Sequence, residues 1–200
     1  MLKPQDIVML LKILAFMQDN DEIMPQNKLA VLLCMSASEV HAGMKRLVLS
    51  GLLSPVLIDD PKNKIILKPN KKACEECLIS GVKYFFPAQF GAYTRGIVTS
   101  YAAPILEKHL ILGDDPVPVW PYGEGNMRGL ALEPLYSSVP NSIAQFPDSN
   151  FYEYLVLVDA IRSGRAREKN LAIQLLKEKL YGEPQRRKGH NQSKNVRVRG

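Results

Sequence analysis

The sequence predicts an α+β fold in which three short helices and a β-hairpin come first, a loop-rich α+β region follows, and a helical hairpin ends the folded part. Three observations predict it. Apolar side chains recur with helical spacing through the first fifty residues, and this period gives way to short extended segments after Gly51. Prolines and glycines crowd residues 81–147, and helical periodicity returns at Asp148.

The first fifty residues predict three helices. Pro4 begins the first, at a position where a helix tolerates proline, and one apolar stripe follows. A short second helix starts near Asn27. Ser36 is placed to cap a third helix, with Glu39 three residues later completing a capping box, and Gly51 ends that helix.

Residues 53–58 and 64–68 predict the two strands of a hairpin, because they flank the sequence DDPKN, whose residues favour a turn. Three helices followed by a two-stranded hairpin is the order of a winged helix domain. We therefore expect residues 1–69 to form an N-terminal winged helix.

Residues 70–182 predict a second domain, for partner binding, sensing or dimerisation. We expect a helix over residues 70–80, short strands at 82–86 and 117–120, a helix within 100–112 and a turn between strands at 123–129. Two helices joined by a short turn at Ser163-Gly164 then predict an antiparallel helical hairpin.

Composition excludes several classes of protein. With 46% hydrophobic and 23% charged residues, the 200-residue chain is of globular type. No run approaches the ~20 apolar residues that a membrane span needs. Asp6 and Lys12 interrupt the apolar N-terminus, and no small-residue cleavage site follows, so we expect a cytoplasmic protein without a membrane partner.

The formal net charge of +6 is concentrated at the C-terminus. Residues 183–200 carry six basic side chains and one acidic side chain and show no apolar periodicity, so we expect a disordered basic tail. Such a tail can add nonspecific affinity for phosphate backbones or simply add solubility.

No motif predicts catalysis, a metal or a cofactor. Cys74 and Cys77 form a lone CxxC without a paired-histidine partner, which favours two cysteines packed on one helical turn. The glycines of residues 123–129 match neither common phosphate-loop spacing, and no GxSxG, HExxH or paired-carboxylate signature is present. We expect a protein that is not an enzyme.

Residues 29–53, LAVLLCMSASEVHAGMKRLVLSGLL, resemble the helix-turn-helix of winged-helix transcriptional regulators, most nearly the MarR-like group. The resemblance covers about the first 70 residues and is carried by the Ser-x-Ser-Glu-Val turn, the Lys-Arg-Leu segment and the closing Gly-Leu-Leu. It implies that the helix at about residues 36–50 enters the major groove of double-stranded DNA while the hairpin approaches the flanking backbone.

The outward face of that helix supplies the candidate contacts. Lys45 and Arg46 are predicted to pair with phosphates or read guanine, and His41 to donate to a base. Ala42 is predicted to contact a thymine methyl group. The full set of predicted DNA-contacting residues is Ser36, Ser38, Glu39, His41, Ala42, Lys45 and Arg46 on the helix, with Lys62 and Lys64 at the hairpin tip.

These patterns together predict a sequence-specific DNA-binding transcriptional regulator that acts as a homodimer. Two alternatives stay open. An antitoxin-like protein would neutralise a co-encoded partner through residues 81–182 and regulate its own operon, by analogy of architecture. A winged-helix adaptor would bind only protein, as the net charge of about +1 over residues 1–68 allows.

Overall fold

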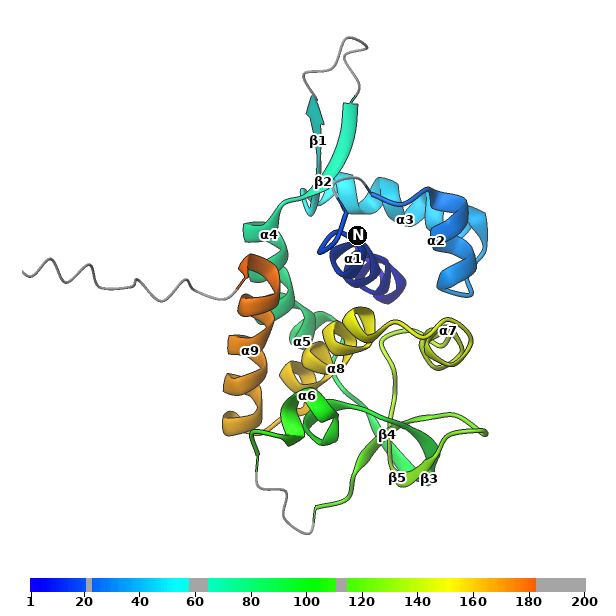
Figure 1. Ribbon diagram of the computed structural model, residues 1–200, viewed down its shortest axis with the longest axis vertical. Helices are drawn as coiled ribbons and strands as arrows, with labels where there is room; N and C mark the ends of the chain where they lie inside the picture. Colours follow the sequence, from blue (N-terminus) through cyan, green and yellow to red (C-terminus); the bar gives the residue numbers. More distant parts are fainter. Residues whose placement is uncertain (21–22, 58–64, 111–114, 183–200) are drawn as a thin grey trace, which may run out of the picture.

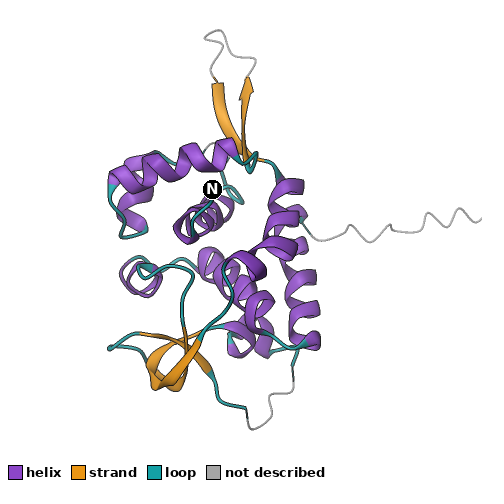
Figure 2. Ribbon diagram, turned by 180° about the vertical axis from the view of Figure 1, so that it is seen from behind, coloured by secondary structure: helices purple, strands orange, loops and turns teal. Residues whose placement is uncertain are grey.

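A computed structural model describes residues 1–20, 23–57, 65–110 and 115–182 (Figure 1). The fold is α+β, with 55% helix and 17% strand, as the sequence predicts. Helices form the body, a two-stranded sheet projects from one end, and a three-stranded sheet lies at the other (Figure 2). None of the helices in the described ranges is long and apolar enough to cross a membrane.

The N-terminal elements follow the prediction closely. Helices α1 (Pro4–Phe16), α2 (Gln26–Leu32) and α3 (Ala37–Leu49) precede the antiparallel strands β1 (Leu53–Leu57) and β2 (Ile65–Pro69). The predicted capping box of α3 is confirmed, because Ser36 Oγ accepts from the Glu39 amide and the Glu39 carboxylate accepts from the Ser36 amide. Gly51, at φ 73°, ends α3 as predicted.

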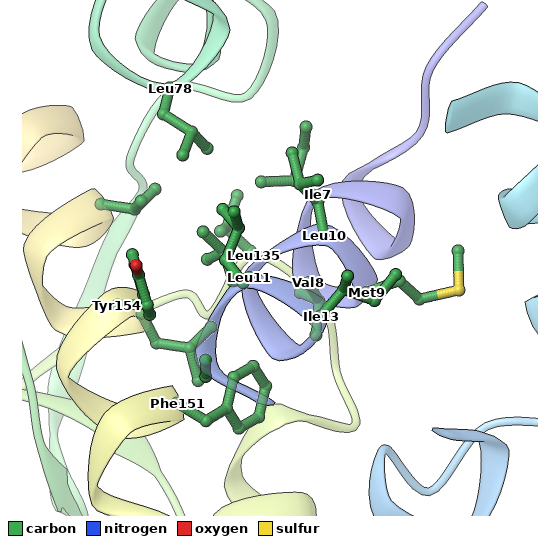
Figure 3. Close-up of a cluster of buried hydrophobic side chains, with 14 of the residues drawn as sticks. Ile7, Val8, Met9, Leu10, Leu11, Ile13, Leu78, Leu135, Phe151 and Tyr154 are labelled. Atoms are coloured by element: carbon green, nitrogen blue, oxygen red, sulfur yellow. The ribbon is translucent and has the colours of Figure 1, made fainter. Parts of the chain in front are cut away.

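Helix α1 is more deeply buried than a one-stripe amphipathic helix. Every residue from 6 to 15 is buried, because α3 packs against one side of α1 and α8 against another. Figure 3 shows α1 side chains facing Phe151 and Tyr154 of α8. The prediction of a single buried stripe is therefore wrong, since α8 comes from a distant part of the sequence.

The segment after the hairpin is helical for longer than predicted. Helix α4 (Lys71–Glu76) passes through a π-helical turn η1 (Cys77–Gly81) into α5 (Val82–Phe85). The predicted strand at residues 82–86 is wrong, because a short, mostly apolar segment looks the same by periodicity in a strand and in a helix. In the helix, Val82 is buried while Tyr84 and Phe85 are exposed.

Strands β3 (Phe90–Val98), β4 (Pro118–Pro121) and β5 (Met127–Leu132) close into a small barrel. β3 is antiparallel to both partners and β4 is parallel to β5. Glycine allows this closure: a Cβ atom on Gly96 would lie 2.0 Å from the Trp120 carbonyl oxygen, and one on Gly125 would lie 2.3 Å from the Gly96 backbone. The predicted strand at 117–120 is confirmed. The turn predicted at 123–129 is confirmed for residues 123–126, whereas residues 127–129 belong to β5. Strands β3 and β5 were not predicted.

Between β3 and β4, the helix predicted within residues 100–112 is present only as two short pieces, the 3-10 turn η2 (Ser100–Ala102) and α6 (Pro104–Glu107). Helix α7 (Val139–Gln145) then leads into α8 (Ser149–Ser163) and α9 (Ala166–Tyr181), which form the predicted helical hairpin.

The hydrophobic core does not divide at the predicted boundary between residues 69 and 70. One cluster of buried side chains runs from α1 and α3 through α8 to α9 and includes Trp120 of β4. Lys12 of α1 donates to Asp148, the residue that caps α8, at 2.8 Å. The N-terminal elements are thus packed on the C-terminal hairpin as one body.

Candidate nucleic-acid interface

The turn between α2 and α3 is held by main-chain hydrogen bonds. Met35 N–H donates to the Ala30 carbonyl at 3.0 Å and Cys34 N–H donates to the Val31 carbonyl at 3.1 Å, with Cys34 in the left-handed region at φ 52°. This is the Schellman arrangement of a helix C-terminus. Because Ser36 starts the capping of α3 directly afterwards, the angle between the two helices is fixed by local structure.

Several predicted contact residues lie on the surface of α3. Ser36, Ser38, His41 and Lys45 are exposed, and Ala42 is half-buried. The Lys45 ammonium forms no ion pair with any residue in the described ranges. Its charge is therefore available to a ligand.

His41 lies beside the start of α2. Its Nδ1 is 3.3 Å from Gln26 Oε1, within hydrogen-bond distance. The ring of His41 is therefore positioned by Gln26 while its exposed side faces outward.

Arg46 is turned inward, and the prediction that it faces outward is wrong. Its Nε and Nη2 atoms donate to the two carboxylate oxygens of Asp6 at 2.7 and 2.6 Å. The Asp6 side chain is fully buried and that of Arg46 is 20% exposed. Hydrogen bonding to Asp6 raises the pKa of the Arg46 guanidinium, so the guanidinium stays charged.

Gly43 explains this geometry. A Cβ atom at this position would lie 1.8 Å from Met9 Cε and 2.8 Å from Asp6 Oδ1, so glycine leaves room on α3 for these two side chains of α1. Arg46 is one turn further along α3 and reaches the same carboxylate. The partner lies 40 residues earlier in the chain, which no local pattern reveals.

Glu39 is also engaged within the protein. In addition to its capping bonds with Ser36, it accepts a hydrogen bond of 2.6 Å from the Tyr136 hydroxyl, which lies between β5 and α7. The bonds from Tyr136 and Ser36 hold the pKa of the Glu39 carboxyl below its usual value. Glu39, predicted as one of the DNA-contacting residues, thus ties α3 to the segment before α7.

An apolar groove, which the sequence reasoning missed, lies beside Lys45. It has a volume of about 380 Å³ and is lined by Gln26, His41, Met44, Lys45, Val48, Leu49 and Leu67. Leu49 is 83% exposed, and the hairpin continues the apolar surface with Leu57 and Ile65. The run Leu47-Val48-Leu49 could have predicted this groove. Three successive apolar residues on a helix point in directions 100° apart, so a single packed face cannot cover all of them.

The hairpin tip is not part of the described structure. Lys62 and Lys64 lie outside the described residues, so the structure does not place these two predicted contacts. On the described strands, the exposed residues at the outer end of the hairpin are the apolar Val56, Leu57 and Ile65.

Cys74 and Cys77 of the CxxC motif serve packing. Burial raises the pKa of the Cys74 thiol to about 12, and its Sγ lies 3.5 Å from the Leu52 carbonyl oxygen. Cys77 is half-buried on the π-helical turn, and burial also raises the pKa of its thiol. Across the described ranges, no three His, Cys, Asp or Glu side chains lie close enough to hold a metal ion.

Comparison of the chain with protein-family models, with curated proteins and with solved structures finds no match.

Proposed function

We propose that the chain is a sequence-specific double-stranded DNA-binding protein of winged-helix type, acting in the cytoplasm as a transcriptional regulator. Helix α3 lies in the major groove and the β1–β2 hairpin lies beside it. The observation that supports this is the exposed row of Ser38, His41 and Lys45 on a helix whose N-terminus is capped and whose angle to α2 is fixed. An α-helix fits the major groove, and residues near its N-terminus reach base edges.

The corrected contact set is smaller than the predicted one. With Arg46 and Glu39 bound inside the protein, Lys45 carries the one formal charge of the outward row. Since phosphate contacts dominate affinity, a single copy of α3 binds weakly. A homodimer on a palindromic site doubles the contacts, and we include dimerisation in the proposal.

A selection of genomic DNA fragments bound by the full chain, followed by titration of an enriched fragment, tests the proposal. Lys45→Ala should weaken binding by about 5- to 10-fold and lower the slope of log affinity against log salt by about 1, since one phosphate contact is lost. The melting temperature should stay unchanged, because Lys45 is exposed and forms no ion pair with a described residue.

Lys108→Ala is the matched control, because Lys108 is an exposed lysine after α6, remote in sequence from α3. The proposal fails if no fragment is enriched, or if the two variants bind an enriched fragment equally well.

The apolar groove favours a second candidate, a protein-binding adaptor that uses the same face. Exposed Leu49, Leu57 and Ile65 resemble the centre of a protein interface more than a phosphate-contacting surface. Sedimentation of the wild-type chain and of the Leu49→Glu variant distinguishes the regulator from the adaptor. If only the wild type self-associates, and it binds no DNA fragment, the face is a protein interface and the adaptor replaces the regulator.

A further inference from the structure

The barrel carries two arginines directly opposite each other. Arg95 of β3 and Arg128 of β5 are partners in the antiparallel register, so their side chains project from the same face of the strand pair. Both are exposed. Like charges in this position destabilise a strand pair, unless an anion lies between them.

No described residue supplies that anion. Arg46, Arg162 and Arg165 each form an ion pair with an aspartate, whereas neither Arg95 nor Arg128 forms one within the described ranges. The structure thus pairs three of its arginines with carboxylates and leaves this strand pair without one.

Exposed aromatic side chains lie on the same strand as Arg95. Tyr93, two residues before Arg95 on the same face, is 64% exposed. Phe90, at the start of β3, is 51% exposed. Aromatic residues, methionine and arginine are the residues enriched at the centres of protein interfaces, where lysine is depleted.

The strands are held rigidly at this position. The backbone of Gly125 packs directly on that of Gly96, the residue after Arg95, and Tyr122 N–H donates to the Arg95 carbonyl at 3.1 Å. A rigid strand pair fixes the backbone positions of the two arginines before a partner arrives, which lowers the backbone entropy lost on binding.

We propose that this outer face of β3 and β5 is a docking surface for an acidic segment of a partner protein. Arg95 and Arg128 bind its carboxylates, with the bidentate geometry that a guanidinium favours, and Tyr93 and Phe90 cover its apolar neighbours. The surface lies at the end of the molecule opposite the β1–β2 hairpin (Figure 1), so it does not depend on the proposed DNA contact.

An acidic protein segment fits better than a nucleic acid. Glu124, in the turn between β4 and β5, and Glu133, directly after β5, are both exposed and flank β5 in the chain. They would repel an extended phosphate backbone, which carries a charge at every nucleotide. A short acidic segment places its carboxylates only at the arginine pair.

Selection of a displayed random-peptide library on the full chain tests the proposal, with counter-selection on the variant carrying both Arg95→Ala and Arg128→Ala. Enriched peptides should be rich in Asp and Glu. Each single alanine variant should bind an enriched peptide about 30-fold more weakly, the loss expected when one partner of a desolvated charge pair is removed.

Arg167→Ala is the matched control, since Arg167 is an exposed arginine on α9 that also forms no ion pair with a described residue. It should bind the peptide as the wild type does. Failure to enrich acidic peptides, or equal weakening by Arg167→Ala, overturns the proposal. Arginine-dependent binding of single-stranded oligo(dT) in place of any peptide overturns it in favour of a nucleic acid.

Arg128→Glu provides a second measurement. It replaces the like-charge pair by an opposite-charge pair, so the melting temperature of the free chain should rise by about 1–3 °C while peptide binding is lost. A lower melting temperature would show that Arg128 stabilises the strand pair, and it would overturn the argument that the pair lacks a partner.

Discussion

Cys34 occupies a backbone position that glycine usually fills. Its φ of 52° lies in the left-handed region, at the C-terminus of α2, where Gly51 at φ 73° holds the equivalent place after α3. A side chain with a Cβ atom costs about 1–2 kcal/mol in this conformation. The cysteine therefore lowers the stability of the turn that orients α3.

Cys34→Gly should raise the free energy of unfolding by about 0.5–1 kcal/mol, since the greater freedom of glycine in the unfolded chain offsets part of the relief. Urea denaturation measures this. Gly51→Ala is the opposite test: no atom lies within 4 Å of the added Cβ, so a loss of about 1 kcal/mol would come from backbone strain alone. Unchanged stability in Cys34→Gly would mean that the strain is absent.

Arg46→Ala should destabilise the protein, whereas an outward-facing arginine could be removed without loss. The substitution leaves the fully buried Asp6 carboxylate without its bidentate partner. Because the arginine is partly exposed, the expected cost is about 2–3 kcal/mol, below that of a wholly buried pair. Thermal denaturation of Arg46→Ala, compared with Lys45→Ala, measures this loss of stability. Equal melting temperatures for the two variants would contradict the structural role of Arg46.

At the scale of the element, the start of α8 depends on a charged pair. Asp148 accepts from the Phe151 amide at 3.0 Å and from Lys12 Nζ at 2.8 Å, and Lys12 also lies 4.8 Å from the centre of the Phe151 ring. Burial tends to raise the pKa of the Asp148 carboxyl. The hydrogen bonds from Lys12 and Phe151 lower it further than burial raises it, so the net shift is downward from 3.8.

A carboxyl whose pKa is lowered on folding stabilises the protein above its unfolded pKa, and this contribution is lost as pH falls through the folded pKa. Asp148→Asn should therefore unfold more easily than the wild type at pH 7, by about 2 kcal/mol, because Lys12 stays buried without a counter-charge. The difference should shrink as the pH falls below about 4. Melting curves of both proteins over this range measure it, and a constant difference would exclude the linkage.

Elements with local signals were predictable, and elements defined by distant contacts were not. The capping box of α3, Gly51 and the helical hairpin depend on neighbours in sequence, and the structure confirms them. β3 and β5 contain glycines that a strand pattern disfavours, and their purpose appears only when Trp120 and Gly125 pack against Gly96. The outward face of α3 was predictable for Ser38 and Lys45 but not for Arg46, whose partner lies on α1.

At the scale of the whole molecule, the single hydrophobic cluster predicts one cooperative unfolding transition. Leu10 of α1, Leu47 of α3 and Leu176 of α9 belong to the same core, so neither end can lose its packing alone. Scanning calorimetry should give equal calorimetric and van't Hoff enthalpies. Two resolved transitions would show that residues 1–69 and 70–182 unfold as separate domains.

The burial of α1 has a consequence for synthesis on the ribosome. Lys12 is translated 136 residues before its partner Asp148, and the α8 side chains that cover α1 follow later still. At a synthesis rate of ~5–20 residues per second, the apolar surface of α1 lacks its packing against α8 for roughly 7–30 s. The helices that precede the hairpin therefore leave the ribosome with α1 incompletely buried. Truncated chains that end before α8 should aggregate or occupy chaperones, although every element of the proposed DNA-binding face has already been made.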